Sequence, residues 1–178
     1  YKPILSGFNK FKIYESDSYK LLEPLLKNIN ITDIKAITPW LFKHPLAPSI
    51  AASKENKSLK YEEVLNWCLE KINKSNQNTV NIFEGAGGIF VPIEGKKTIF
   101  DLIIDTKSDV ILIVGNYLGS VSHTISAIKN LENMKIKVVN ILLNENQDTH
   151  IDINDTFYLI NTNINSNIKI RKIRKNDR

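Results

Sequence analysis

The sequence predicts an α/β fold with a doubly wound, mostly parallel sheet and helices on both faces, a three-layer αβα arrangement. Residues 109–115 are a continuous apolar run, which is typical of a strand buried on both faces of a parallel sheet, and residues 136–143 are expected to form another buried strand. A stretch with helical spacing of its apolar residues lies between them. The resulting order, strand–helix–strand–helix, indicates parallel strands joined by crossover helices.

Length and composition favour one domain over residues 1–178, because a chain of 178 residues that is 42% hydrophobic can bury a substantial core. No apolar run approaches the roughly 20 residues that span a bilayer, so we expect no membrane segment. Cys68 is the only cysteine, which fits a reducing, cytoplasmic location. The net charge of +5 equals the basic excess of residues 168–178, a C-terminal segment expected to be partly disordered. The remaining body is neutral, which argues against a nucleic-acid surface.

Two short helices are expected early in the chain, on either side of an ordered loop at residues 38–48. Ser16 or Asp17 is a suitable N-cap for the first helix, because a short polar side chain can accept from the free amides of the first turn. The loop holds three prolines, and the second helix begins at residues 49–52.

A longer helix follows, because apolar residues recur at helical spacing from Tyr61 to Ile72. Ser58 is its expected N-cap, and two glutamates lie in its first turn. Cys68 lies on the apolar stripe, so a role in core packing is favoured over reactivity.

The remaining elements alternate. A strand at residues 79–83 ends at a glycine-rich turn, and Thr98 caps the next helix. The expected strands at 109–115 and 136–143 flank a helix that begins at Gly119. A helix at 153–160 and a strand at 168–173 complete the chain.

The glycine-rich turn is the first candidate site. Its residues are Glu84, Gly85, Ala86, Gly87 and Gly88. A carboxylate at the carboxyl end of a strand points into the crevice where α/β sheets bind ligands, and glycines let backbone amides approach an anion. This pattern suits a magnesium ion shared with phosphate oxygens. An ordinary turn after a strand explains the same residues, and the stretch alone leaves both interpretations open.

Other polar residues at predicted strand ends and helix starts are expected to gather at the same edge. They are Lys2, Ser6, Asp17, Glu84, Asn116, Ser120, Ser122 and Asn144. A cation, two carboxylates, a glycine turn and a helix N-terminus suit Mg-phosphate chemistry better than acyl transfer. The plainer explanation is that loops, and therefore polar residues, begin where strands end.

Five segments, in order and at fitting spacing, resemble the dethiobiotin synthetase family. They are YKPILSG at 1–7, SD at 16–17, PLAP at 45–48, EGAGG at 84–88 and VGNYLGSVSHT at 114–124, and Asn144 continues the match. The resemblance covers residues 1–146 and implies a P-loop NTPase-like fold. It also implies an ATP- and Mg-dependent ligase of biotin synthesis, which closes the ureido ring of dethiobiotin from 7,8-diaminopelargonic acid, CO2 and ATP.

The resemblance also implies roles for individual residues. Lys2 would be catalytic, neutralising carbamate and phosphate charge, and Asp17 and Glu84 would bind Mg2+. The substrate would contact Ser6, Gly119, Ser120, Val121 and Ser122. The nucleotide would contact Glu84, Gly85, Ala86, Gly87, Gly88 and Asn144. A homodimer is implied as well.

The family's phosphate loop, G-x-x-x-x-G-K-S/T, precedes the Lys-Pro segment in relatives, and the sequence from Tyr1 does not contain it. Residues 95–98 lack its spacing, so we expect an N-terminally truncated form of the fold. Two alternatives to the ligase are an inactive remnant of that enzyme and a small basic nucleic-acid-binding module that uses residues 168–178.

Overall fold

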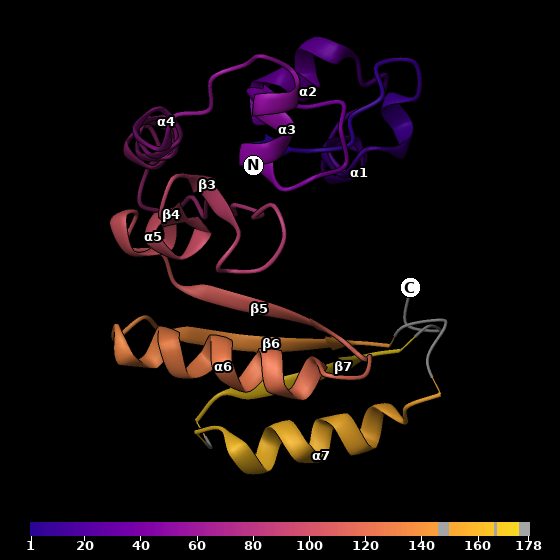
Figure 1. The fold of residues 1–178 in the computed structure, drawn as a ribbon, viewed down its shortest axis with the longest axis vertical. Helices are drawn as coiled ribbons and strands as arrows, with labels where there is room; N and C mark the ends of the chain where they lie inside the picture. Colours follow the sequence, from indigo (N-terminus) through magenta and orange to yellow (C-terminus); the bar gives the residue numbers. More distant parts are fainter. Residues whose placement is uncertain (146–149, 166, 175–178) are drawn as a thin grey trace. The chain divides into compact units, whose positions relative to one another are not determined.

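The computed structural model describes residues 1–145, 150–165 and 167–174 and divides into two compact units (Figure 1). The first unit is Tyr1–Thr106 and the second is Lys107–Arg178. Both units contain parallel strand pairs with helices between them, so the predicted α/β class is confirmed. Each unit is described by itself, and the single-domain organisation stays a prediction.

The first unit combines short strands with five α-helices in its described residues. Its elements are β1 (Ile4–Leu5), a 3-10 helix (Ile13–Glu15), α1 (Asp17–Leu22), α2 (Ile31–Ile37), β2 (Trp40–Leu41), α3 (Pro48–Lys54), α4 (Tyr61–Asn73), β3 (Pro92–Glu94), β4 (Lys97–Thr98) and α5 (Ile99–Asp105). Strands β1 and β2 are parallel, and β3 and β4 form an antiparallel pair. The loop predicted at 38–48 therefore contains a strand, because residues 40–41 pair with the strand before α1.

Two helix starts agree with the sequence and one does not. The Ser16 side chain caps α1 by accepting from the Tyr19 amide, and Thr98 forms a capping box on α5. The N-cap of α4 is Lys60, so the prediction of Ser58 was wrong. The reason is that Glu94, from β3, takes the capping role: its Oε2 accepts from the Tyr61 amide at 2.8 Å. A carboxylate at a helix N-terminus also favours the helix dipole.

The prediction of a strand at 79–83 was also wrong. Residues 79–84 form no strand, although residues 82 and 84 are hydrogen-bonded to the backbone of Tyr1. The Tyr1 nitrogen donates to the Ile82 carbonyl at 2.7 Å, and the Glu84 amide donates to the Tyr1 carbonyl at 2.8 Å. Two hydrogen bonds around one residue are a parallel bridge without the neighbours that make a ladder. Val80 and Ile82 are accordingly exposed.

The core of the first unit packs α3 and α4 against the segments around β1, β2 and β3. Tyr61, Val64 and Cys68 form the buried stripe of α4, as predicted from their spacing. Burial raises the pKa of the Cys68 thiol to about 12, so this cysteine is an unreactive core residue.

The second unit is a three-stranded parallel sheet in the order β5-β6-β7. Its elements are β5 (Val110–Gly115), α6 (Ser120–Asn133), β6 (Val138–Asn144), α7 (Ile153–Asn163) and β7 (Lys169–Ile173). Both crossover helices lie on the same side of this sheet (Figure 1). The prediction that residues 109–115 are buried on both faces was wrong in the structure, since Ile111 and Ile113 on the other face are 54% and 63% exposed.

The basic segment at 168–178 begins as an ordered strand. Residues 169–173 form β7, as the sequence predicted, and residues 175–178 lie outside the described residues. Lys172 is directed to α7, where its Nζ donates to Asn154 Oδ1 at 2.8 Å and lies 4.7 Å from the centre of the Phe157 ring. No helix in the described part of the chain has the length and apolar character needed to cross a membrane.

Asn116 ties the end of β5 to the start of α7. Its side chain is fully buried, donates to the Ile151 carbonyl at 2.7 Å and accepts from Thr156 Oγ1 at 2.5 Å. Its backbone amide donates to the Asn144 carbonyl at 2.9 Å. Asn116 was grouped with candidate site residues, but these contacts satisfy both ends of its amide within the second unit.

We predict that Asn116→Ala lowers the free energy of unfolding by roughly 1–3 kcal/mol, because the buried Thr156 hydroxyl loses its acceptor and the Ile151 carbonyl loses one donor. Urea denaturation measures this. Asn163→Ala is the matched control: the Asn163 amide is exposed and binds only within its own helix. Equal, small effects of the two substitutions would contradict the role assigned to Asn116.

Candidate functional site

The centre of the first unit's candidate site is the ammonium group of Lys2. The residue is only 4% exposed, yet its Nζ carries a charge. It lies 2.7 Å from Glu84 Oε1, 3.4 Å from Asp17 Oδ2 and 3.3 Å from the Gly85 carbonyl oxygen. A buried cation is tolerated only when anions and hydrogen bonds compensate for its lost hydration. The structure therefore brings together three residues that are far apart in the sequence, as predicted.

Each member of this cluster is placed by a local feature. The Lys2 amide donates to the Ile37 carbonyl, at the end of α2. Asp17 is the first residue of α1, directly after the Ser16 cap, so its carboxylate lies at the positive end of that helix. Glu84 is fixed through its own amide, which donates to Tyr1. Both carboxylates remain about half exposed and can reach a ligand.

The glycine turn after Glu84 has one position that requires glycine. Gly87 has a φ of +88°, and a Cβ there would lie 3.0 Å from Val91 Cγ2. At Gly88, by contrast, a Cβ would meet no atom within 4 Å, so this position is open. The turn follows Glu84 directly, its Gly85 carbonyl accepts from Lys2, and the glycine backbone between Gly85 and Gly88 can approach an anion closely.

Ser6 lies in the same unit, immediately after β1. Its Oγ is buried and has no hydrogen-bond partner among the described residues. A buried hydroxyl without a partner costs about 1–3 kcal/mol, so such a group is a natural contact for a bound ligand.

The predicted substrate residues 119–122 lie in the second unit, at the start of α6. Gly119 is the N-cap with a φ of +94°, and Ser120 is buried with its Oγ unpaired among the described residues. The Ser120 amide donates to Tyr117, whereas Val121 and Ser122 occupy first-turn positions that have no intrahelical acceptor. Free amides and the helix dipole make this end suitable for an anion.

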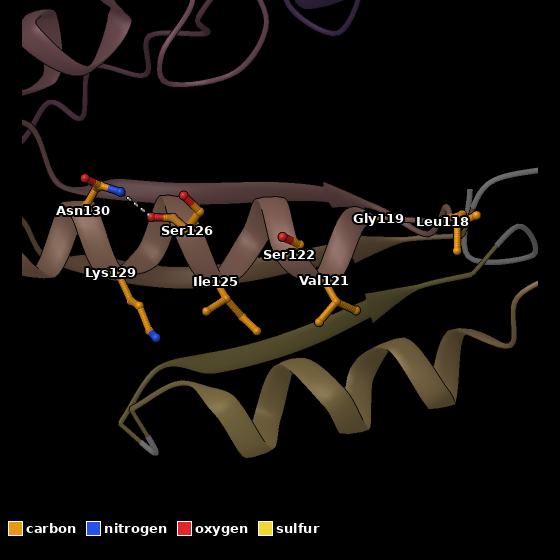
Figure 2. A pocket seen from close by; sticks show the side chains of 8 residues that line it. All are labelled: Leu118, Gly119, Val121, Ser122, Ile125, Ser126, Lys129 and Asn130. Carbon is orange, nitrogen blue, oxygen red and sulfur yellow. Dashed lines mark hydrogen bonds between the residues drawn. The ribbon is translucent and has the colours of Figure 1, made fainter.

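An open groove runs along α6 from this N-terminus (Figure 2). Its lining consists of Leu118, Gly119, Val121, Ser122, Ile125, Ser126, Lys129 and Asn130. Three of the five predicted substrate residues thus line one groove, with Ser120 buried behind them. The lining combines apolar side chains with Ser122, Ser126 and Asn130, and Lys129 lies at the end away from Gly119 (Figure 2).

The sequence reasoning missed Lys129 as a groove residue. Val121, Ile125 and Lys129 are spaced four apart, so they project from successive turns on the same side of the helix (Figure 2). That spacing was the available signal.

Asn144, the predicted adenine contact, is the last residue of β6. It pairs with Gly115 of β5 and with Ile173 of β7, and its carbonyl accepts from Asn116. It is therefore held at the carboxyl edge of the second unit's sheet, where α/β sheets bind ligands. Residues 146–149, which follow it, lie outside the described residues.

The predicted site residues thus form two sets. Lys2, Ser6, Asp17 and the turn at 84–88 belong to the first unit, and Lys2 contacts Asp17, Glu84 and Gly85 directly. Residues 119–122 and Asn144 belong to the second unit. The roles assigned to all of them stay predictions.

The chemistry of the first set fits a hard divalent cation. Asp17 and Glu84 supply carboxylate oxygens, the ligand type that Mg2+ prefers, and both already share one positive charge, that of Lys2. Among the described residues no group of three or more His, Cys, Asp or Glu side chains could enclose a metal. Two carboxylates are sufficient for Mg2+, which commonly completes its octahedron with water and phosphate oxygens.

Comparisons with known proteins identify the family. Residues 1–176 match a family model described as an AAA domain, in agreement with the P-loop NTPase-like α/β fold. The ATP-dependent dethiobiotin synthetase of Phenylobacterium zucineum is 33% identical over 148 residues, 83% of this chain and 63% of the relative. That of Caulobacter vibrioides is 30% identical over 160 residues, 90% of this chain and 71% of the relative.

A third relative, the ATP-dependent dethiobiotin synthetase of Bacillus subtilis subsp. natto, is 34% identical over 152 residues, 84% of this chain and 62% of the relative. The chain therefore spans slightly less than two-thirds of the length of some of the curated relatives it matches. The matches nevertheless cover most of this chain, and they confirm the resemblance carried by its motifs. The chain belongs to the ATP-dependent dethiobiotin synthetase family.

Proposed function

We propose that the protein containing this chain closes the ureido ring of dethiobiotin from 7,8-diaminopelargonic acid, CO2 and ATP. The observation that carries the proposal is the buried Lys2 ammonium, held between Asp17 and Glu84 beside a glycine turn. The names of the relatives, ATP-dependent dethiobiotin synthetases, supply the reaction class.

The reaction needs charge control more than a strong base. One amine of the substrate adds to CO2 and gives a carbamate, with loss of a proton. A carbamate oxygen attacks the γ-phosphorus of ATP, and ADP leaves. The second amine then attacks the carbonyl carbon of the mixed anhydride, and phosphate leaves as the ring closes. Anionic groups thus approach one another twice, and each approach is unfavourable without a positioned cation.

Lys2 supplies that cation. Its ammonium group has three protons, and its present partners are two carboxylate oxygens and one carbonyl oxygen. Exchange of one of these for a carbamate or phosphate oxygen keeps the charge paired, so the enzyme needs no reorganisation of the buried lysine. A preorganised charge in a partly dehydrated site acts more strongly than one in water.

Asp17 and Glu84 are the proposed holders of Mg2+. When bound, the ion would offset the charge of the phosphate oxygens during transfer. The adjacent glycine backbone would let phosphate oxygens approach the turn, and Ser6 would offer its unpaired hydroxyl to the diamine.

In the second unit, the proposal assigns roles to the start of α6 and to Asn144. The free amides of Val121 and Ser122 suit the carboxylate of 7,8-diaminopelargonic acid, and the apolar groove along α6 suits its alkyl chain. Asn144 would hydrogen-bond adenine from the edge of the sheet. A homodimer and a cytoplasmic location belong to the same proposal and rest on the family resemblance and the single cysteine.

The first test replaces the cation. In the full-length protein, Lys2→Met should lower kcat/KM for ring closure at least ~100-fold, because it removes a charge that stabilises the transition state. Steady-state assays of ATP- and CO2-dependent dethiobiotin formation measure this.

The matched control is Lys60→Met. Lys60 also forms a 2.7 Å ion pair with a glutamate, but its side chain is 57% exposed and lies at the start of α4. Its loss should leave kcat/KM within twofold of the wild-type value. A Lys2→Met enzyme that retains full activity would remove Lys2 from the mechanism.

A second test compares two neighbouring glycines. Gly87→Ala forces an L-residue to a φ of +88° against Val91, a strain of about 1–2 kcal/mol, and should weaken ATP-Mg binding. Gly88→Ala enters open space and should change the free energy of unfolding by less than about 0.5 kcal/mol. Isothermal titration calorimetry with ATP-Mg and urea denaturation provide both readouts. Equal ATP affinity in the Gly87→Ala and wild-type proteins would show that the turn does not contact the nucleotide.

A further inference from the structure

Glu55, the residue that follows α3, holds a loop that none of the site predictions included. Its side chain is 8% exposed and accepts from three donors. Oε1 accepts from the backbone amides of Lys43 at 2.5 Å and His44 at 3.3 Å, and Oε2 accepts from Lys57 Nζ at 2.7 Å. Such charge-assisted hydrogen bonds are about twice as strong as neutral ones, so Glu55 is a firm anchor for this backbone.

Lys57 attaches the same segment at a second point. Its Nζ donates to the Leu41 carbonyl at 3.1 Å while it pairs with Glu55. The Glu55–Lys57 pair therefore fixes backbone groups at both ends of residues 41–44, the continuation of β2. The hydrogen bond from Lys57 holds the pKa of the Glu55 carboxyl below its ordinary value, so the anchor stays ionised at neutral pH.

Residues 41–44 in turn hold the backbone on both sides of Ser6. The Phe42 amide donates to the Leu5 carbonyl at 2.9 Å, and the Gly7 amide donates to the His44 carbonyl at 3.1 Å. The backbone of His44 thus connects Glu55 with Gly7: its amide donates to Glu55, and its carbonyl accepts from the Gly7 amide. Ser6 is the residue between these two attachments.

The close fit at Gly7 limits how far Ser6 can move. Gly7 has a φ of +80°, and a Cβ at this position would lie 3.3 Å from Pro45 Cβ, in the loop that follows His44. A shift of the 43–45 backbone would therefore displace Gly7 and change the position of the unpaired Ser6 hydroxyl.

We infer that Glu55 is a positioning residue for the substrate, which acts through His44 and Gly7 to hold Ser6 in its binding geometry. This inference rests on the proposed function, in which Ser6 contacts the diamine. A misplacement of a binding group by about 1 Å can cost ~100-fold in rate. Because Glu55 touches no residue of the Lys2–Asp17–Glu84 cluster in the contacts between described residues, its loss should affect the diamine more than ATP.

The test uses the full-length enzyme and four variants. Glu55→Ala should raise KM for 7,8-diaminopelargonic acid about tenfold or more and leave KM for ATP within twofold, since binding of a single substrate is disturbed. Glu55→Gln should show a smaller increase, because its amide oxygen can still accept from Lys43. Lys57→Met should resemble Glu55→Gln. Glu70→Ala should match wild type, since Glu70 pairs with Lys74 on the exposed surface of α4.

A double-mutant cycle with Ser6→Ala separates positioning from simple stabilisation. If Glu55 acts through Ser6, Glu55→Ala should raise KM for the diamine by less than twofold in the Ser6→Ala background. Amide hydrogen exchange adds a structural readout: the Gly7 and His44 amides should exchange faster in Glu55→Ala, and the Tyr61 amide should not. If Glu55→Ala does not fold, the same cycle is run with Glu55→Gln.

Two outcomes would overturn the inference and are distinguishable. In the first, the wild-type enzyme forms dethiobiotin, but Glu55→Ala raises KM equally for both substrates, or its effect adds to that of Ser6→Ala. Glu55 would then be a purely structural residue. A wild-type enzyme that forms no dethiobiotin would refute the proposed function and, with it, this role of Glu55.

Discussion

The burial of one ammonium group is the constraint on which the first unit's candidate site depends. Lys2 is almost inaccessible to solvent, so its charge must be balanced by groups that the fold brings to it. Those groups come from α1 and from the turn after residue 83. Because removal of either carboxylate would leave the cation less compensated, the arrangement of the site and the stability of this part of the unit are coupled. The fold itself therefore holds one ammonium and two carboxylates together at this site.

Few hydrogen bonds hold the backbone around Lys2. Tyr1 pairs with residues 82 and 84 through two hydrogen bonds, and the Lys2 amide is held by Ile37. The rings of Phe83 and Trp67 both pack against Tyr1. Glu84 is therefore placed by a single pairing and an aromatic cluster, where the sequence pattern favoured a full strand. The extended conformation of this segment is enough to place the Glu84 carboxylate, and a fully paired strand is not needed for it.

Features that depend on neighbours in the sequence could be predicted, and features that depend on distant partners could not. Local chemistry and residue spacing predict the Ser16 and Thr98 caps, the buried stripe of α4 and the strands β5 and β6. The cap of α4 comes from Glu94, which lies far from this helix in the sequence, so no local sequence pattern predicts it. Asn116 stood at a strand end like a ligand-binding residue, yet its partners at 151 and 156 make it structural. The motifs grouped Lys2, Asp17 and Glu84, and the structure places these three side chains in contact, whereas Glu55 lies in no motif and is found only through its contacts.

Two of the candidate site residues are serines with unpaired hydroxyls, a structural feature that the sequence motifs do not reveal. Within the described residues, the buried Oγ atoms of Ser6 and Ser120 have no hydrogen-bond partner, and alanine would fit either position without that cost. Ser6 follows a strand whose backbone is held from both sides, and Ser120 opens a helix in which the Val121 and Ser122 amides have no intrahelical acceptor. Each hydroxyl is thus held rigidly while its own hydrogen-bonding capacity is left unused. In the proposed function, hydrogen bonds to a bound polar ligand would recover this cost at both positions.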